Sequence, residues 1–467
     1  MKRIRFIALV LSLFCIIPLV IIPASWGVSI SDLALEFTES SLPESRSMMI
    51  AYSLLDLYYY FFILSNLFPV LFLSISSSLS ISKEKRKTRE AKSESNGCYG
   101  YSDIFSGSRF PKVSIIIPCY NEALHVSATI TSCFRQDYRG EIEIIVVDDG
   151  SKDRTWSIGK IFKTNEKGRD IRIFHKQNGG KASALRHGIF KSSGEILLMT
   201  DGDSGIDPNA VSSIVDTFRA HPDAGIVGGY VFIKNTHSGY LTKLQQLEYI
   251  ITQHLIRINQ SEDGSVLIAP GPIFGMRADL ARTLPPLERT IVEDCDLTMS
   301  VLPTAFTTRS TIGAVSHTTA PTTWMAWIRQ RKRWIYGQFQ AWRENRWHLK
   351  RNPWGLYTYF TWVTTTLSSI VFVITLFFTT GLLISGGDYY RFLEFISIRT
   401  SLVFLTYLFA RSLVLLQYRE GRKMLPFLPL KVMYDLVNGF LTAYLYIRYI
   451  TGRGVKMIWG NRSGVVY

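Results

Sequence analysis

The chain has 467 residues, of which 47% are hydrophobic and 19% are charged, and its formal net charge is +15. This combination is typical of a membrane protein with a basic cytoplasmic part, and the length allows two or three domains. The sequence has no basic stripe with interleaved aromatic residues, which argues against nucleic acid as a partner, and its five scattered cysteines form no zinc or disulfide pattern, which indicates free thiols in a reducing compartment.

Two apolar runs precede the first region with soluble character. Phe6–Ala24 lacks a following small-residue cleavage site, so we interpret it as a transmembrane helix rather than a signal peptide. Ile50–Ile75 is the second predicted span, and the acidic loop Ser29–Glu44 between them suits the outer face. Lys83–Lys92 is strongly basic and marks the cytoplasmic side, and Ser93–Ser108 is predicted to be a linker.

A soluble α/β domain is predicted from Lys112 to about Val315. Short runs rich in β-branched residues predict four buried strands: Val113–Pro118, Ile142–Val147, Ile171–His175 and Glu195–Thr200. Segments of helical length lie between them: Leu124–Phe134, Asp153–Phe162 and Lys181–Phe190. Strands that alternate with helices imply βαβ units and a mainly parallel sheet.

The C-terminal part returns to apolar segments. Thr323–Trp347 mixes tryptophan with Arg and Lys, which is typical of a membrane-surface helix. Leu356–Ser385 is uncharged and long enough to span, and Leu402–Gln417 is a further apolar run. For Leu425–Ile450 we predict a segment that lies flat or turns back instead of crossing as one helix.

Particular residues support that prediction for the last segment. Lys431 and Asp435 could share one polar face, and Pro426 and Pro429 would break the start of a helix. Arg411 interrupts an apolar run and is predicted to face the interior of the helix bundle.

Acidic side chains follow three of the predicted strands. Asp201 and Asp203 end the fourth strand, and Pro118–Glu122 and Val147–Asp153 end the first two. Because the carboxyl ends of parallel strands meet at one edge of the sheet, these groups could form a nucleotide site, with the Asp-x-Asp pair binding Mg²⁺ or Mn²⁺. Asp149 could accept the imide N–H of a uracil. Ordinary turn chemistry is the alternative for each motif taken alone.

Three further motifs add groups suited to transfer chemistry. Gly179–Leu185 supplies a flexible loop with Lys181 at a helix start, suited to a phosphate. Thr290–Asp294 runs into a helix, so its carboxylates are either N-terminal caps or include a general base. Gln330–Trp334 is either a basic interfacial helix or an indole platform for a sugar, with Arg331 and Arg333 facing diphosphate charge.

The order of these motifs resembles family 2 glycosyltransferases, and most closely the membrane-integrated processive synthases of hyaluronan, chitin and poly-N-acetylglucosamine. The motifs are Pro-x-Tyr-Asn-Glu, Asp-Asp-Gly-Ser, Gly-Gly-Lys-Ala, Asp-x-Asp, Glu-Asp and Gln-x-x-Arg-Trp, within about residues 113–345. The resemblance implies a GT-A fold and inverting transfer from a UDP-sugar with Mg²⁺ or Mn²⁺. This chain has Val292 where the family usually has Thr, so we expect only the loss of a hydroxyl contact.

The resemblance also implies roles for individual residues. It implies donor binding for Pro118, Tyr120, Glu122, Asp148, Asp149, Lys181, Asp201 and Arg333, and metal binding for Asp201 and Asp203. Asp294 is implied as the general base with Glu293 beside it, and Gln330 and Trp334 as acceptor-binding residues. Trp459-Gly-Asn-Arg462 is similar to a Trp-Gly-Thr-Arg motif that closes over the donor, although an ordinary basic tail is the alternative.

The sequence therefore predicts a multi-pass plasma-membrane synthase with a cytoplasmic catalytic domain, which extends a polysaccharide from a UDP-sugar, with N-acetylglucosamine the preferred sugar. Its partners would be the donor, the growing polysaccharide and the lipid bilayer. Transfer of one sugar to a lipid carrier and an inactive nucleotide-sugar-binding scaffold are the alternatives. The predicted regions are residues 1–82 (two spans), 83–110 (basic linker), 111–318 (GT-A domain), 319–352 (interfacial helices), 353–450 (C-terminal helices) and 451–467 (cytoplasmic tail).

Overall fold

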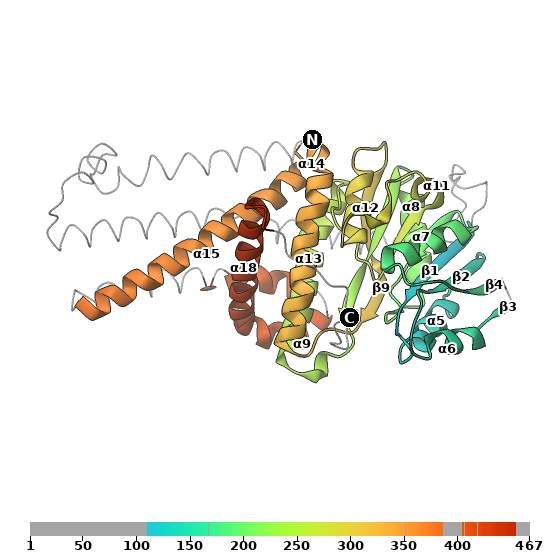
Figure 1. Ribbon diagram of the computed structural model, residues 1–467, viewed down its shortest axis with the longest axis horizontal. Coiled ribbons are helices and arrows are strands. Elements are labelled where there is room, and N and C mark those ends of the chain that lie inside the picture. Colours follow the sequence, from blue (N-terminus) through green and yellow to red (C-terminus); the bar gives the residue numbers. More distant parts are fainter. Residues whose placement is uncertain are drawn as a thin grey trace.

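The computed structural model describes residues 110–166, 168–350, 352–385, 404–405, 407–417 and 419–453. The two predicted N-terminal spans, the basic linker as far as residue 109, and Trp459 and Arg462 lie outside the described residues. In the described part, a sheet flanked by helices occupies one end of the molecule, and the long helices α13, α15 and α18 lie beyond it (Figure 1).

The four predicted strands form neighbouring parallel strands of one sheet. They are β1 (Val113–Cys119), β2 (Ile142–Asp148), β4 (Arg169–His175) and β5 (Ile196–Met199), in the spatial order β4-β2-β1-β5. The registers Val113↔Ile142 and Val113↔Ile196 align the carboxyl ends of β2, β1 and β5 at one edge. This alignment brings the predicted strand-end motifs together.

The rest of the sheet corrects the expectation of a mainly parallel arrangement. The additional strands are β3 (Thr164–Glu166), β6 (Gly205–Ile206), β7 (Ala224–Ile233), β8 (Phe274–Arg277) and β9 (Thr307–Thr318). The complete order is β3-β4-β2-β1-β5-β8-β7-β9-β6, and the pairs β3–β4, β5–β8, β7–β8 and β6–β9 are antiparallel. The sheet is therefore mixed. The four-residue β8 is too short for its sequence to have revealed a direction.

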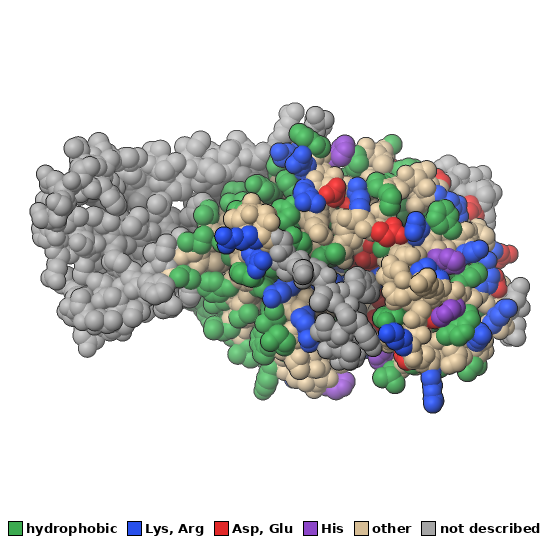
Figure 2. Space-filling view, in the orientation of Figure 1, with side chains coloured by type: hydrophobic (Ala, Val, Ile, Leu, Met, Phe, Trp, Pro, Cys, Tyr) green, Lys and Arg blue, Asp and Glu red, His purple; other side chains and the backbone are tan. Residues whose placement is uncertain are grey.

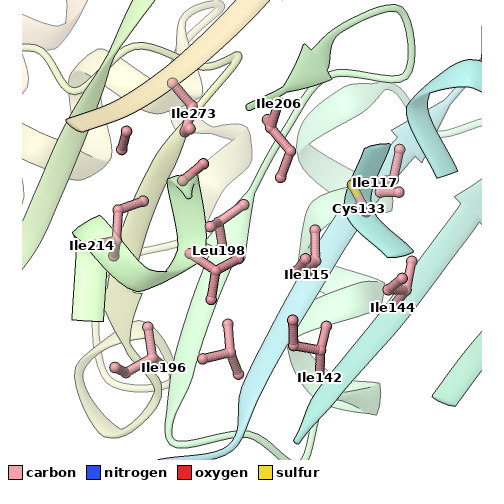
Figure 3. Packing of buried hydrophobic residues seen from close by; sticks show 14 of the residues in the cluster. Ile115, Ile117, Cys133, Ile142, Ile144, Ile196, Leu198, Ile206, Ile214 and Ile273 are labelled. Carbon is pink, nitrogen blue, oxygen red and sulfur yellow. The ribbon is translucent and has the colours of Figure 1, made fainter. Parts of the chain in front are cut away.

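Both faces of the sheet are buried, and alternate residues of β1 serve opposite faces. Ile115 and Ile117 belong to a cluster with residues of α5 (Val126–Phe134) and α8 (Ala210–Ala220), as Figure 3 shows for Cys133 and Ile214. Ile116 instead packs with α7 (Lys181–Lys191), α11 (Ala278–Ala281) and α12 (Glu293–Val301). This two-sided burial explains why the strands are continuous apolar runs instead of alternating ones.

A second core joins the sheet domain to the C-terminal helices. Its helices include α9 (Tyr240–Thr252), α13 (Trp324–Glu344), α14 (Arg346–Leu349), α15 (Pro353–Ser385), α17 (Arg419–Met424) and α18 (Leu428–Ile450). A π-helical segment (Gln253–Arg257) and α10 (Ile258–Glu262) continue α9 along the chain. Trp327 of α13 is fully buried in this core. Trp327 packs against Tyr434 of α18, whereas Trp324 and Trp347 are exposed, so the membrane-surface role of α13 stays a prediction that does not apply to this buried tryptophan.

Hydrophobic side chains gather over α15 and α18 on the face shown in Figure 2, whereas charged side chains are spread over the sheet domain. None of the helices in the described part of the chain is both long and apolar enough to cross a membrane.

The segment Leu425–Ile450 does not turn back. It begins with a 3₁₀ turn (Leu425–Phe427) that contains Pro426 and continues as the single helix α18, with Pro429 in its first turn. The predicted polar face exists, because Lys431 and Asp435 form an ion pair one turn apart, and the Tyr407 hydroxyl donates to Asp435 at 2.5 Å. Arg411 lies over the ring of Tyr407, one turn earlier in the same helical segment, 3.7 Å from its centroid, and its position in the interior of the helix bundle stays a prediction.

Helix α13 approaches α12 closely at Gly337. A Cβ atom there would lie 2.6 Å from Cγ1 of Val292, which is below any normal contact. We expect Gly337→Ala to destabilise the protein by about 1–3 kcal/mol, because a packed core resists an added methyl group. Gly439→Ala is the matched control, since its Cβ would meet nothing closer than 3.7 Å. Thermal unfolding should show a lower midpoint for the first variant only, and equal midpoints would contradict this packing.

Candidate functional site

The loops that follow β1 and β2 are held together by reciprocal hydrogen bonds. Asn121 adopts the left-handed backbone conformation, with φ of 54°, which asparagine tolerates better than most residues. Its backbone N–H donates to Ser151 Oγ at 2.9 Å, and its side-chain oxygen accepts from the Lys152 N–H at 2.8 Å. The Glu122 N–H donates to Thr155 Oγ1 at 2.7 Å. Pro118, Tyr120 and Glu122 therefore lie on one ordered rim with the start of α6 (Thr155–Ile161).

The Asp-x-Asp loop after β5 reaches the same rim. A Cβ atom on Gly202 would lie 2.9 Å from the Pro118 carbonyl oxygen and 3.3 Å from Glu122 Cγ, so only glycine allows this approach. The Gly202 carbonyl also accepts from Thr129 Oγ1 at 3.0 Å. The three strand-end motifs are thus adjacent, as the sequence predicts.

Asp149 corrects one prediction for this rim. We expected its carboxylate to accept the imide N–H of a uracil. Instead, its Oδ1 is bound by Lys176 Nζ at 2.7 Å and its Oδ2 by the Gly180 N–H at 2.7 Å, while the Gly179 N–H contacts both oxygens. The carboxylate is buried, and protein donors occupy the hydrogen-bonding positions of both its oxygens. Asp149 therefore anchors the glycine loop that leads into Lys181.

Asp148 is also buried, and its partners lie on the next strand and loop. Its Oδ2 pairs with Nδ1 of His175 at 2.5 Å, and its Oδ1 accepts from the Ser151 N–H at 3.3 Å. The half-exposed His175 ring lies against Trp156, with 5.1 Å between the ring centroids. Asp148 therefore orients an imidazole at the rim, and the sequence analysis did not single out that histidine.

Lys181 lies among the carboxylates of two separate motifs. Its Nζ is 2.8 Å from Asp201 Oδ1 and 2.5 Å from Glu293 Oε1. Burial alone would lower the pKa of Lys181, but the Asp201, Glu293 and Asp294 charges together raise it above its ordinary value. Lys181 is therefore a fixed cation, and Glu293 acts as its partner.

Asp294 lies in the first turn of α12, beside this cluster. Its Oδ2 accepts from the Gly271 N–H at 2.9 Å, and its Oδ1 from the Cys295 N–H at 2.8 Å. Burial, followed by the neighbouring Glu293 charge, raises the pKa of Asp294 to about 6 from an ordinary 3.8. A carboxylate with this pKa is ionised at neutral pH and is a stronger base than an ordinary aspartate, which suits a general base.

We expect an acid limb in the pH–rate profile from this group. Below about pH 6 Asp294 takes up a proton, so the rate should fall by about tenfold per pH unit, and above that pH it should level. Initial rates from pH 4.5 to 8 would measure the limb, with thermal unfolding followed at each pH as a control. A limb centred near pH 4 in a fully folded enzyme would contradict the assignment.

Asp203 offers the second predicted metal ligand. Its carboxylate is buried, its Oδ1 accepts from Ser204 Oγ at 3.0 Å, and Lys234 Nζ donates to its backbone carbonyl at 2.9 Å. In the described part of the chain, no group of three or more His, Cys, Asp or Glu side chains is arranged to hold a metal ion. Mg²⁺ is usually held by one or two carboxylates with substrate phosphates, so this donor set fits such an ion.

The Gln-x-x-Arg-Trp motif lies on α13, which packs on the helix of the predicted base. Arg289 binds Asp296 of α12 in a bidentate pair at 2.5 and 2.7 Å, and Asn345 at the end of α13 donates to the same carboxylate at 2.8 Å. Gln330 and Trp334 are half-buried, and the Trp334 indole lies beside the ring of Tyr249, with 6.3 Å between centroids.

Tyr249 lies close to both this motif and Asp201, the first acid after β5. Burial raises the pKa of Tyr249 to about 12, and the charges of Asp201 and Arg333 both act on it. The predicted role of Arg333 toward a diphosphate stays a prediction.

Arg331 corrects a second prediction. We expected its guanidinium to face a diphosphate, but it is buried and binds Glu248 of α9 at 2.5 Å. It also donates to the Tyr434 hydroxyl of α18 at 3.1 Å. Sequence reasoning missed both partners. The only available signal was a single acid, Glu248, in the otherwise apolar half of α9, which does not reveal its partner.

The chain is similar to known glycosyltransferases in sequence and in fold. Residues 114–284 match the model of the family described as Glycosyl transferase family 2. The chain is 34% identical over 243 residues to an N-acetylglucosaminyltransferase of Azorhizobium caulinodans, covering 49% of this chain and 60% of that protein. It is 32% identical over 240 residues to an N-acetylglucosaminyltransferase of Rhizobium meliloti, covering 49% and 56%. The chain thus spans less than two thirds of the length of these relatives.

A similar fold occurs in the solved structure of mannosyltransferase PcManGT from Pyrobaculum calidifontis in complex with GDP-Man and Mn²⁺. The TM-score is 0.52 at 15% identity, and the match covers 82% of this chain and 100% of that one.

Proposed function

We propose that this chain, which contains a glycosyltransferase family 2 domain on a GT-A-like mixed α/β sheet, is a processive inverting synthase that polymerises sugar from a UDP-sugar. The observation that carries the proposal is the position of Asp294, a carboxylate of raised pKa beside Lys181, Asp201 and the Gln-x-x-Arg-Trp helix. N-acetylglucosamine is the proposed sugar, because several similar proteins are named N-acetylglucosaminyltransferases.

The proposed reaction assigns one proton transfer to the protein. Asp294 takes the proton from a hydroxyl of the acceptor's terminal sugar, and that oxygen forms a bond to the anomeric carbon of the donor. The bond between this carbon and the diphosphate breaks, and UDP leaves with the electron pair. Attack from the face opposite UDP inverts the configuration. The Gly271 N–H and the Cys295 N–H hold the carboxylate in place throughout.

The reaction also requires that the negative charge on the departing diphosphate be stabilised. Lys181 lies at the start of α7 and remains protonated, so it offers a positive charge near Asp201. A divalent ion held by Asp203 and Asp201, Mg²⁺ or Mn²⁺, would supply further charge neutralisation when bound.

The proposed setting is the plasma membrane, with the catalytic domain on the cytoplasmic side and the polysaccharide exported. Exposed apolar side chains on α15 and α18 support a lipid partner, among them Leu356, Leu367, Met433 and Ile450. The predicted spans at residues 6–24 and 50–75, and a closing role for Trp459 and Arg462, belong to the same proposal.

Purified full-length protein in detergent, incubated with a panel of radiolabelled UDP-sugars and Mg²⁺ or Mn²⁺, tests the function. We expect label from UDP-N-acetylglucosamine to enter a product that lengthens with time. A product that stops after one sugar on a lipid would support single transfer instead. If none of the donors is consumed, the chain is not a synthase.

A further inference from the structure

A buried polar group links three helices behind the Gln-x-x-Arg-Trp motif. Its members are Glu248 of α9, Arg331 of α13, and Tyr434 of α18, which we call the α9–α13–α18 triad. The Tyr434 hydroxyl donates to Glu248 Oε2 at 2.5 Å, and Arg331 contacts both partners. Trp327 Nε1 donates to the same hydroxyl at 2.7 Å. Arg331 and Tyr434 are buried and Glu248 is partly buried, and within the triad the Arg331 Nε has no hydrogen-bond partner among the described residues.

The triad is in direct contact with the predicted acceptor platform. The Arg331 guanidinium lies over the Trp334 indole, 4.4 Å from its centroid, and 5.6 Å from the centroid of Trp327. A guanidinium that stacks on an aromatic ring fixes the ring's orientation as well as its charge environment. Although burial alone would lower the pKa of Arg331, the Glu248 charge raises it, so this cation stays charged.

We propose that Glu248 is a positioning residue for the acceptor: together with Tyr434 it fixes Arg331, which in turn orients the Trp334 indole toward the terminal sugar. This inference rests on the proposed function, because it assumes that Trp334 contacts an acceptor. It adds that α18, a helix far along the chain, is part of the acceptor site. It also gives Arg331 and Arg333 different roles, because Arg331 orients the Trp334 indole and does not face the diphosphate.

The proposal predicts a specific kinetic pattern for Glu248→Gln. The variant keeps the shape of the side chain but removes the charge that holds Arg331, so the apparent KM for acceptor should rise by about tenfold or more. The KM for the UDP-sugar should change less than about twofold, because the donor-binding loops lie elsewhere. Tyr434→Phe should show the same pattern to a smaller degree, and Glu248→Asp should partly restore the wild-type value.

Glu344→Gln on α13, the helix that carries Arg331, is the control for loss of a glutamate charge, because Glu344 forms an exposed pair with Arg343 at 3.2 Å. Thermal unfolding of every variant shows whether the fold is intact. If Glu248→Gln does not fold, Arg331→Lys replaces it, because lysine keeps the charge and loses the planar stacking on Trp334.

The experiment measures two quantities on full-length protein in detergent. The first is the dissociation constant of radiolabelled chitotetraose by equilibrium dialysis, which needs no catalysis, and the second is donor and acceptor KM. Weaker chitotetraose binding in Glu248→Gln with unchanged donor KM supports the proposal. Unchanged chitotetraose binding, or donor and acceptor KM rising equally, overturns it. Wild-type protein that binds chitotetraose but consumes no UDP-sugar refutes the proposed function alone, since binding still reports on Glu248.

Discussion

Replacing Asp294 by Asn is expected to reduce sugar transfer by at least about a hundredfold while leaving UDP binding nearly unchanged. The variant keeps the size of the side chain and can still accept the Gly271 N–H, but an amide cannot take a proton from an attacking hydroxyl. General bases contribute about 10²–10⁴-fold to rates, which sets the expected loss. Initial transfer rates and calorimetric binding of UDP would measure the two effects separately.

Asp279→Asn is a suitable control for that experiment, because its side chain is largely exposed and lies in α11, away from the base. It should leave both rate and binding intact. Should Asp294→Asn lose UDP binding as severely as it loses transfer, Asp294 would belong to the donor site and the proton-transfer role would be wrong.

The second large effect is expected for Asp203→Asn. Removal of the charge leaves a hard cation without its preferred ligand, so turnover should fall by about a hundredfold or more, since even groups that only support a ligand can cost 10–100-fold. The buried position of Asp203 next to Ser204 suits an isosteric amide, so the fold should survive. Rates titrated with Mn²⁺ and Mg²⁺ would show a higher half-saturating metal concentration.

Asp207→Asn provides the comparison, at the residue that directly follows β6. Its carboxylate is half-exposed and pairs with His317 Nε2 at 3.0 Å, outside the acid pair. The control should respond to metal as the wild type does. Near-normal turnover of Asp203→Asn at ordinary metal concentration would show that Asp203 does not hold the ion.

The centre of the sheet was predictable because its signal is local. Strands β1, β2, β4 and β5 are short apolar runs that end in polar turns, and both features can be recognised without knowing their neighbours. The same local logic located the rim motifs and the polar face of Lys431 and Asp435. Strands β7, β8 and β9 were not predicted, because their directions depend on which distant segment they pair with.

The predictions for the side chains of Asp149 and Arg331 were wrong for a related reason. Asp149 and Arg331 both belong to motifs that the sequence singles out, but sequence does not show which partner a charged group meets. Asp149 meets amides 30 and 31 positions away, and Arg331 meets side chains 83 and 103 positions away. A motif therefore locates a residue on the rim or the helix, whereas the packing of separate elements decides the direction of its side chain.

The bonds that join Asn121 to Ser151 and Lys152 have a thermodynamic consequence for ligand capture. Loops that become ordered only on binding lose conformational entropy at that moment, about 0.5–1.5 kcal/mol for each flexible side chain immobilised. Here the two loops are already fixed to each other when the protein folds. A nucleotide bound at this rim, as proposed, would therefore meet a preorganised surface, and more of its contact energy would be available as affinity.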